Sequence, residues 1–298
     1  MIYTITFSPS IDYSVFLNNF EIGKINRTKK QIITPGGKGI NVSLILAKLG
    51  VNSVATGFIG GFTGKYVKHE LNALGVANDF VEVEGMTRIN VKINTDEETA
   101  INGNGIKVDK LSFMRLIEKI NDYDSDDIVV ISGSVPRYDF DAFDLLLEEI
   151  NRKNIKFMVD VTGKNLINSL KYHPFIVKPN KAELEETLGI KIKSNEDLLK
   201  ASKELLDQGA ENVIISLGAD GAFMIGKKLK PIYVKPYDGV AISSVGAGDS
   251  LLAGFIYEYL KTKDMAKALK CGVYVGAATV YSDGLATDSE LENALEKL

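Results

Sequence analysis

The sequence is poor in the side chains that form disulfides and zinc sites. Among its 298 residues there are one cysteine, Cys271, and two histidines, His69 and His173. A single cysteine cannot form an intramolecular disulfide, and these three residues are too few for a zinc-ligand cluster. We therefore expect Cys271 to be a small core residue.

Long apolar runs and charge of one sign are also missing. No apolar segment reaches the roughly 18 residues that a membrane-spanning helix needs, and the N-terminal sequence MIYTITFSPS lacks the basic and apolar regions of a signal peptide. The net charge is −4, with acidic and basic residues interspersed. Because no basic stripe or polybasic run is present, we expect neither a nucleic-acid nor a membrane partner, and we expect a cytoplasmic protein.

The composition that remains, 45% hydrophobic and 25% charged, is that of an ordinary globular protein. β-branched apolar runs alternate with helical patterns, which is typical of βαβ units around a parallel sheet. We predict one α/β domain over residues 1–298. The expected strands are Ile2 to Phe7, Ser53 to Ile59, Asp127 to Ser132, Lys156 to Asp160, Phe175 to Lys178 and Asn212 to Leu217; the expected helices are Gly39 to Leu49, Gly64 to Leu74, Asp109 to Ile120, Phe140 to Asn151, Lys181 to Leu188 and Asn195 to Gln208.

Three parts of the chain depart from this alternation. The last third has two short strand-like runs and then helices that should cover one side of the sheet: Ala222 to Ile225 and Ile232 to Lys235, then Gly248 to Leu260, Asp264 to Tyr281 and Ser289 to Leu298. Residues 13–34 and 80–102 show short alternating strands with no helix after them. They predict a small antiparallel sheet inserted in two pieces, which is either a surface hairpin or a lid over an active site.

The strongest motif is Ser244-Val245-Gly246-Ala247-Gly248-Asp249-Ser250, which runs into the apolar segment LLAGFIYEYL. Glycines at a helix start let an anion approach the unpaired backbone amides and the positive end of the helix dipole. The segment therefore predicts an anion hole for a phosphoryl group in transfer. Asp249 could accept the proton of an attacking hydroxyl, which a loose transition state requires only late, so a carboxylate with an ordinary pKa would suffice. Alternatively, Asp249 only caps the helix.

A second glycine turn, Pro35-Gly36-Gly37-Lys38-Gly39-Ile40-Asn41, also opens an amphipathic helix. Lys38 and Asn41 could hold sugar hydroxyls or a phosphate there, unless this is a plain β-α turn with an exposed lysine. Neither this segment nor Gly60-Gly61-Phe62-Thr63-Gly64-Lys65-Tyr66 has the glycine spacing and the Ser or Thr of a nucleotide-binding P-loop. A P-loop enzyme is therefore excluded.

Two further motifs follow predicted strands. In Val177-Lys178-Pro179-Asn180-Lys181-Ala182-Glu183, Asn180 and Glu183 either cap a helix reciprocally or place Glu183 near Mg²⁺, through water. The turn after Ile214-Ile215-Ser216, with Gly218 and Gly221, is either a tight hairpin or a nucleotide site at the carboxyl end of the sheet.

Two lone charged residues complete the set. Asp12, near the end of the first predicted strand, could accept hydrogen bonds from sugar hydroxyls, and Arg88 could bind a phosphate with two parallel hydrogen bonds. Each could equally be a solvated surface residue.

Together these residues closely resemble the ribokinase/PfkB family of carbohydrate kinases along the whole chain. PGGKGINVS is similar to the family's N-terminal signature and SVGAGDSLLAGF to its C-terminal one, with VKPNKAELE and VIISLGADGA in order between them. The segments TFSPSIDY, MTRINVKI, ISGSVP and DGLATDSE most resemble the members that phosphorylate fructose 1-phosphate, with tagatose-6-phosphate kinases as close relatives.

This resemblance implies a three-layer α/β sandwich with a mainly parallel central sheet and a small β-sheet lid at about 13–34 and 80–102, often a homodimer through that lid. It implies ATP with Mg²⁺ as cofactors and a small sugar phosphate as substrate. It assigns catalysis to Asp249 as base and to Gly246, Ala247 and Gly248 as anion hole; sugar-phosphate binding to Asp12, Gly37, Lys38, Asn41, Arg88 and Ser134; and nucleotide and magnesium binding to Lys178, Asn180, Glu183, Ser216, Gly218 and Gly221. Potassium-dependent members carry an acidic residue and threonines before GAGD, where this chain has Ile242-Ser243-Ser244-Val245, so we predict no potassium requirement.

The sequence bears on three alternatives to a fructose 1-phosphate kinase. Tagatose 6-phosphate is the second substrate, since a furanose ketohexose needs a phosphate site at one end and a base at the other whichever sugar binds. A NAD-dependent oxidoreductase would have Gly-x-Gly-x-x-Gly after its first strand, but this strand runs into Ser8-Pro9-Ser10. A sugar-phosphate sensor without activity would be expected to have lost Asp249.

Overall fold

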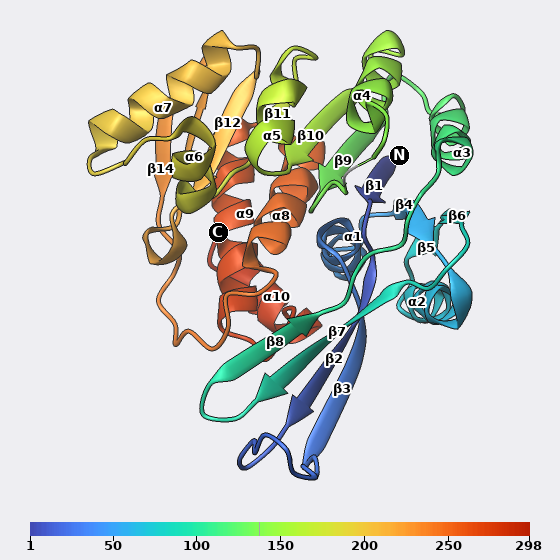
Figure 1. The fold of residues 1–298 in the computed structure, drawn as a ribbon. Helices are drawn as coiled ribbons and strands as arrows, with labels where there is room; N and C mark the ends of the chain where they lie inside the picture. The colour runs from blue at the N-terminus through green and yellow to red at the C-terminus, as the bar shows by residue number, and fades with distance from the viewer. Residues whose placement is uncertain (137) are drawn as a thin grey trace.

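In the computed structural model, which describes residues 1–136 and 138–298, a large central sheet forms the body of the protein (Figure 1). Its strand order is β14-β13-β12-β11-β10-β9-β1-β4-β5, and β6 also pairs with β4. The strands from β5 to β12 are parallel, while β13 and β14 extend one edge in antiparallel fashion. The strands are β1 (Ile2–Thr6), β4 (Ser53–Ile59), β5 (Ala77–Asn78), β6 (Val81–Glu82), β9 (Ile128–Ser132), β10 (Lys156–Asp160), β11 (Ile176–Val177), β12 (Asn212–Ser216), β13 (Ala222–Gly226) and β14 (Leu229–Val234). The predicted mainly parallel α/β sheet is confirmed.

Helices cover both faces of this sheet, and each face has its own buried apolar cluster. One face carries α3 (Lys110–Ile120), α4 (Ala142–Arg152), α5 (Gly163–Leu170), α6 (Lys181–Leu188) and α7 (Asn195–Asp207). The opposite face carries α1 (Lys38–Lys48), α8 (Ala247–Thr262), α9 (Met265–Val280) and α10 (Asp288–Glu296), with α2 (Gly61–Ala73) packed against α1. The last three helices therefore lie on one side of the sheet as predicted, whereas α5 was not predicted.

The core and the helix ends follow from the local sequence. Cys271 of α9 is fully buried, which confirms its predicted place in the core. Helices α7 and α10 begin with reciprocal capping boxes, Ser194 with Asp197 and Thr287 with Glu290. None of the helices in the described part of the chain is both long and apolar enough to cross a bilayer.

Helices α8 and α9 approach each other closely because glycines lie at their contact. A Cβ atom at Gly272 would lie 2.6 Å from the carbonyl oxygen of Leu251, and one at Gly254 would lie 2.7 Å from Cβ of Val275. Side chains at these positions would force the helices apart. This contact fixes the direction of α8, whose first turn reaches the functional site described below.

A second, four-stranded sheet projects from the body, at the bottom of the view in Figure 1. Its order is β3-β2-β7-β8, with β2 (Ser10–Phe16), β3 (Lys30–Gly36), β7 (Arg88–Asn94) and β8 (Glu98–Asn102). The hairpins β2-β3 and β7-β8 are antiparallel, but β2 and β7 run parallel where the hairpins meet. The sheet is therefore mixed rather than antiparallel as predicted. Its second piece also begins later than residue 80, because β6 pairs with β4 of the main sheet.

Candidate active site

A cavity of about 1180 Å³ lies where the carboxyl ends of the main-sheet strands face the second sheet. Five of its lining residues end or directly follow parallel strands: Thr6, Ser132, Asp160, Lys178 and Ser216. Every site residue predicted from the sequence also lines it: Asp12, Gly37, Lys38, Asn41, Arg88, Ser134, Lys178, Asn180, Glu183, Ser216, Gly218, Gly221, Gly246, Ala247, Gly248 and Asp249. Motifs that are far apart in the sequence thus meet in one place, as expected at the carboxyl edge of an open α/β sheet.

The first turn of α8 forms one wall of the cavity. Gly246 precedes the helix in the left-handed conformation, with φ of 79°, which a glycine adopts without strain. The amide of Ser250 donates to the carbonyl of Gly246, and the amide of Ala247 donates to the carbonyl of Ser244 at 3.3 Å. The amides of Gly248 and Asp249 belong to the first turn, where a helix supplies no internal acceptor. This arrangement offers N–H groups and a positive dipole end to an anion.

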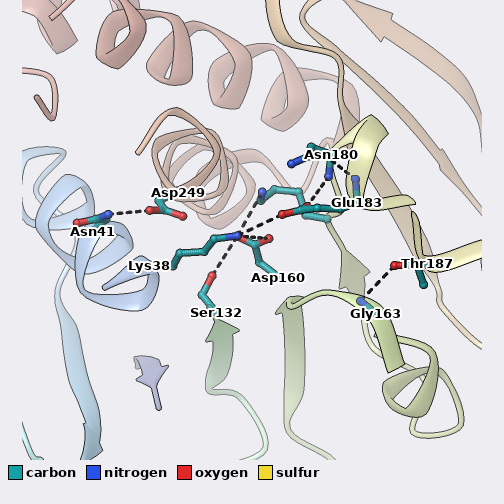
Figure 2. A network of polar contacts seen from close by, with 10 residues as sticks. Lys38, Asn41, Ser132, Asp160, Gly163, Asn180, Glu183, Thr187 and Asp249 are labelled. Atoms are coloured by element: carbon teal, nitrogen blue, oxygen red, sulfur yellow. Dashed lines mark hydrogen bonds and ion pairs between the residues drawn. The ribbon is translucent and has the colours of Figure 1, made fainter. Parts of the chain in front are cut away.

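Asp249 lies in that first turn and is only 5% exposed. Its Oδ2 accepts a hydrogen bond of 2.8 Å from Nδ2 of Asn41, which α1 supplies from the other glycine motif (Figure 2). Burial, and secondarily the charge of Asp160, raise the pKa of Asp249 to about 7, although Asn41, Lys178 and Lys38 oppose this. The sequence-based argument required only an ordinary carboxylate; the structure instead provides one whose basicity is close to that needed at neutral pH.

A network of lysines and carboxylates fills the floor of the cavity (Figure 2). Asp160, at the end of β10, lies 3.3 Å from Nζ of Lys178 and 3.5 Å from Nζ of Lys38, and it accepts a hydrogen bond of 3.1 Å from Ser132. Burial alone would raise the pKa of Asp160, but the two ammonium groups lower it. Asp160 is therefore the ionised partner that holds both lysines in place.

Sequence reasoning missed Asp160 and Ser132. Both end strands whose carboxyl edge also carries Lys178, and this shared position was the available signal. The Lys178 ammonium lies against the start of α8, since a Cβ at Gly248 would be 3.1 Å from Nζ. A lysine beside the positive end of a helix strengthens the attraction for an anion.

Asn180 and Glu183 form a capping box, which was one of the two interpretations of this motif from the sequence. Each side chain accepts a hydrogen bond of 2.8 Å from the other residue's backbone amide. The cap does not use all of Glu183, because its Oε1 lies 3.7 Å from Nζ of Lys38 (Figure 2). Glu183 is thus both a cap and a negative charge on the cavity wall.

The second sheet supplies the other side of the cavity. Asp12 lies within β2 and not near the end of the first strand, as the sequence had suggested. Its Oδ1 accepts hydrogen bonds from Ser10, at 2.7 Å, and from Asn90, at 2.9 Å, while Oδ2 lies 3.9 Å from Nζ of Lys92. Arg88 at the start of β7 donates from Nη2 to the carbonyl of Ser8 at 3.2 Å. Its buried Nε has no partner among the described residues.

The turn after β12 lines the far end of the cavity. The sequence allowed either a tight hairpin or a nucleotide site here. The turn is a tight hairpin into β13, and it also lines the cavity, as a nucleotide site would require. Gly221 has φ of 85°, and a Cβ there would lie 2.0 Å from the carbonyl of Val234, so only glycine fits. The sequence did not point to Tyr237 or Tyr281, which also line the cavity and belong to no motif.

Comparison with known proteins agrees with this geometry. Residues 6–292 match the model of the pfkB family carbohydrate kinases. A 1-phosphofructokinase of Bacillus subtilis is 39% identical over all of this chain and 98% of its own length. A D-tagatose-1-phosphate kinase of Bacillus licheniformis is 36% identical over 100% of this chain and 98% of its own.

Solved structures show the same fold. Phosphofructokinase-2 from Escherichia coli in complex with substrates and products is similar with a TM-score of 0.92 and 28% identity, covering 100% of this chain and 99% of that one. The tetrameric inhibited form of the same protein has a TM-score of 0.91 and 28% identity, covering 99% and 98% of the two chains.

Proposed function

Because the chain belongs to the pfkB family of carbohydrate kinases, we propose that it transfers the γ-phosphoryl group of ATP to fructose 1-phosphate and forms fructose 1,6-bisphosphate. One observation carries this proposal: a buried carboxylate with a raised pKa lies in a helix first turn that can bind an anion, inside the cavity of about 1180 Å³. A phosphoryl transfer needs a base for the hydroxyl and a preorganised positive site for the transferred group.

In this proposal the oxygen of the sugar's terminal hydroxyl forms a bond to the γ-phosphorus, and Asp249 accepts the proton of that hydroxyl. The bond between that phosphorus and the oxygen that bridges to the β-phosphate breaks, and ADP leaves. Gly246, Ala247 and Gly248 provide the backbone amides for the negative oxygens of the transferred group. Asn41 holds the Asp249 carboxylate in position through its hydrogen bond.

We assign the sugar phosphate to the end of the cavity formed by the second sheet. Asp12 offers carboxylate oxygens for hydroxyls, and the partly unpaired guanidinium of Arg88 can bind the 1-phosphate. Gly37, Lys38 and Ser134 lie between this end and Asp249 in our assignment. The second sheet would then act as a lid that excludes water from the reaction.

The nucleotide is assigned to the opposite end, beside Lys178, Asn180 and the turn with Ser216, Gly218 and Gly221. Among the described residues no three His, Cys, Asp or Glu side chains are grouped to hold a metal ion. The site fits Mg²⁺ nonetheless, because this ion typically takes one or two carboxylates and fills its shell with water and phosphate oxygens. Glu183 is the carboxylate we propose for it, and when bound the ion would neutralise phosphate charge. We predict no dependence on potassium.

The comparisons sharpen the choice of substrate. The tagatose relative acts, by its name, on the 1-phosphate, whereas the alternative drawn from the sequence was tagatose 6-phosphate. Both relatives named above therefore take a sugar with its phosphate on carbon 1, and their sugars differ at carbon 4. We propose fructose 1-phosphate because the relative named for it has the higher identity of the two.

The deciding experiment measures kcat/KM for fructose 1-phosphate, tagatose 1-phosphate, fructose 6-phosphate and tagatose 6-phosphate, with ATP and magnesium, following ADP release. Fructose 1-phosphate should be the best substrate. If another sugar phosphate has a kcat/KM tenfold higher, which corresponds to about 1.4 kcal/mol of transition-state stabilisation, the proposed substrate is wrong but the kinase activity is not. Binding of a sugar phosphate without any ADP release would instead indicate a sensor.

We further propose a homodimer formed through the outer face of the second sheet. One row across its four strands, Ile33, Tyr13, Val91 and Ile101, is apolar, and Ile33 and Ile101 are 45% and 58% exposed. Adjacent exposed apolar side chains of this kind favour a protein partner. The tetrameric form of the E. coli structure shows that this fold assembles into oligomers. A cytoplasmic location stays a prediction.

A further inference from the structure

Asn90, in the middle of β7, has no role in the mechanism above, yet it lines the cavity and is 8% exposed. It lies directly beside Asp12 of β2 in the parallel pairing of the second sheet. Its Nδ2 donates the hydrogen bond of 2.9 Å to Oδ1 of Asp12. Its Oδ1 is buried without a hydrogen-bond partner in the described residues.

The orientation of this amide is fixed by its neighbour. If the amide were turned over, its oxygen would face the carboxylate oxygen of Asp12 at the same short distance, and two acceptors would repel each other. Asp12 is itself held by Ser10 and Lys92, so it cannot turn away without losing both contacts. The amide nitrogen must therefore face Asp12, which leaves the oxygen as a preset acceptor.

A buried acceptor without a donor is unfavourable unless a ligand supplies the donor. Within a cavity lined by Asp12 and Arg88, a ring hydroxyl of the sugar phosphate is such a donor. We infer that Asn90 is a specificity-determining residue whose Oδ1 accepts a hydrogen bond from a ring hydroxyl of the ketohexose 1-phosphate. This inference rests on the proposed function and adds to it the residue that recognises the sugar ring.

The pair Asn90 and Asp12 then recognises the sugar in two ways. The amide oxygen and the carboxylate both accept hydrogen bonds, so together they select a sugar that presents hydroxyl donors on this side of its ring. A sugar that lacks the hydroxyl leaves the Asn90 oxygen unpaired in a buried place, and a site of this kind rejects such an analogue strongly.

The test is a cycle of enzyme variants and substrate analogues. Wild type, Asn90→Ala and Asn90→Ser are assayed with fructose 1-phosphate and with its 3-deoxy and 4-deoxy analogues. Serine can still donate a hydrogen bond to Asp12, but its side chain is too short to reach the sugar. The serine variant therefore separates the effect of supporting Asp12 from the effect of contacting the sugar. We expect both variants to lower kcat/KM for fructose 1-phosphate by on the order of 10- to 100-fold, with KM for ATP unchanged within about twofold. For the deoxy analogue that lacks the hydroxyl bound by Asn90, the same substitutions should change kcat/KM by less than about threefold, because the contact is already missing.

Asn94→Ala is the matched control. Asn94 lies on the same strand and face, but its side chain donates to the carbonyls of Val15 and Lys92 and does not line the cavity. It should affect all three substrates equally. The inference is wrong if the Asn90 variants lose the same factor on every analogue, or if they keep wild-type activity on fructose 1-phosphate. If wild type prefers another sugar phosphate, the proposed function fails separately, and the cycle is run with deoxy forms of that sugar.

Discussion

Replacing Asp249 by asparagine should abolish catalysis and at the same time stabilise the folded protein at neutral and alkaline pH. The side chain is 5% exposed, and burial raises its pKa from an ordinary 3.8 to about 7. In the unfolded chain the carboxyl loses its proton near pH 3.8, while in the folded chain it keeps it until about pH 7. The folded state therefore binds more protons between these values, and stability falls as pH rises through this window.

The size of this pKa shift sets the expected change in the free energy of unfolding. At 1.36 kcal/mol for each pH unit, the change from 3.8 to about 7 corresponds to at most about 4 kcal/mol of lost stability above pH 7. Asparagine has no charge to bury and keeps a carbonyl oxygen for the Asn41 hydrogen bond. Asp249→Asn should thus match wild type near pH 4, exceed it increasingly up to about pH 7 and keep that advantage at higher pH, while kcat falls by on the order of 10³ or more.

Two assays check this expectation. Urea unfolding followed by circular dichroism at pH 5, 7 and 8.5 gives the free energy of unfolding, and kcat is measured at saturating ATP. Asp207→Asn, an exposed change in α7 outside the cavity, should show neither effect. A variant that keeps a tenth of the activity would remove Asp249 from the role of base. Unfolding curves that follow wild type at every pH would refute the argument from burial.

Three other substitutions test the remaining assignments. Arg88→Ala should raise KM for the sugar phosphate at least tenfold and KM for ATP hardly at all; equal effects would remove Arg88 from the phosphate site. Glu183→Gln keeps the helix cap, since glutamine also serves in a capping box, but removes the charge, so half-maximal activity should need more magnesium. Glu186→Gln, an exposed change on the same helix, is its control, and identical magnesium titrations would leave Glu183 as a cap only. Ile101→Lys should convert a dimer into a monomer in sedimentation, whereas Leu111→Lys should not, because Leu111 is 76% exposed on α3, away from the second sheet. If both variants stay dimeric, or if the wild type is a monomer, the proposed interface is wrong.

The main sheet was predictable from sequence because it depends on local signals. Apolar β-branched runs and helical periodicity locate the parallel strands, and motifs placed after such strands, such as those with Asn180 and Ser216, gather at one edge. Lys38 and Asp249 follow no parallel strand of the main sheet, so local signals alone did not place them beside Asn180. Only the resemblance to the PfkB family predicted that all of these residues share one site.

The second sheet was harder to predict because its pairing is non-local. Each hairpin has a local pattern, but nothing in either one specifies that β2 and β7 join in parallel. Asp12 was misplaced for the same reason, since β1 and β2 follow one another with only three residues between them and yet belong to different sheets. The partner that fixes Asp12, Asn90, is distant in sequence and became visible only from this pairing.

The charges of the cavity explain why the pKa of Asp160 is lowered and that of Asp249 is raised, and they support the proposed role of a metal ion. Among the described residues its charged lining is balanced, with five basic residues, Lys38, Arg88, Lys178, Lys181 and Lys235, and five acidic ones, Asp12, Asp160, Glu183, Asp238 and Asp249. Asp160 takes the two nearest ammonium groups and stays ionised, so Asp249 is left with an amide partner and a neighbouring negative charge. The same pairing leaves little positive charge for a triphosphate and a sugar phosphate together. In the proposed reaction, a divalent cation and the first turn of α8 would therefore carry much of that neutralisation. The transferred phosphoryl group would then lie next to Asp249, and the deprotonation of Asp249 and the binding of the anions would depend on each other.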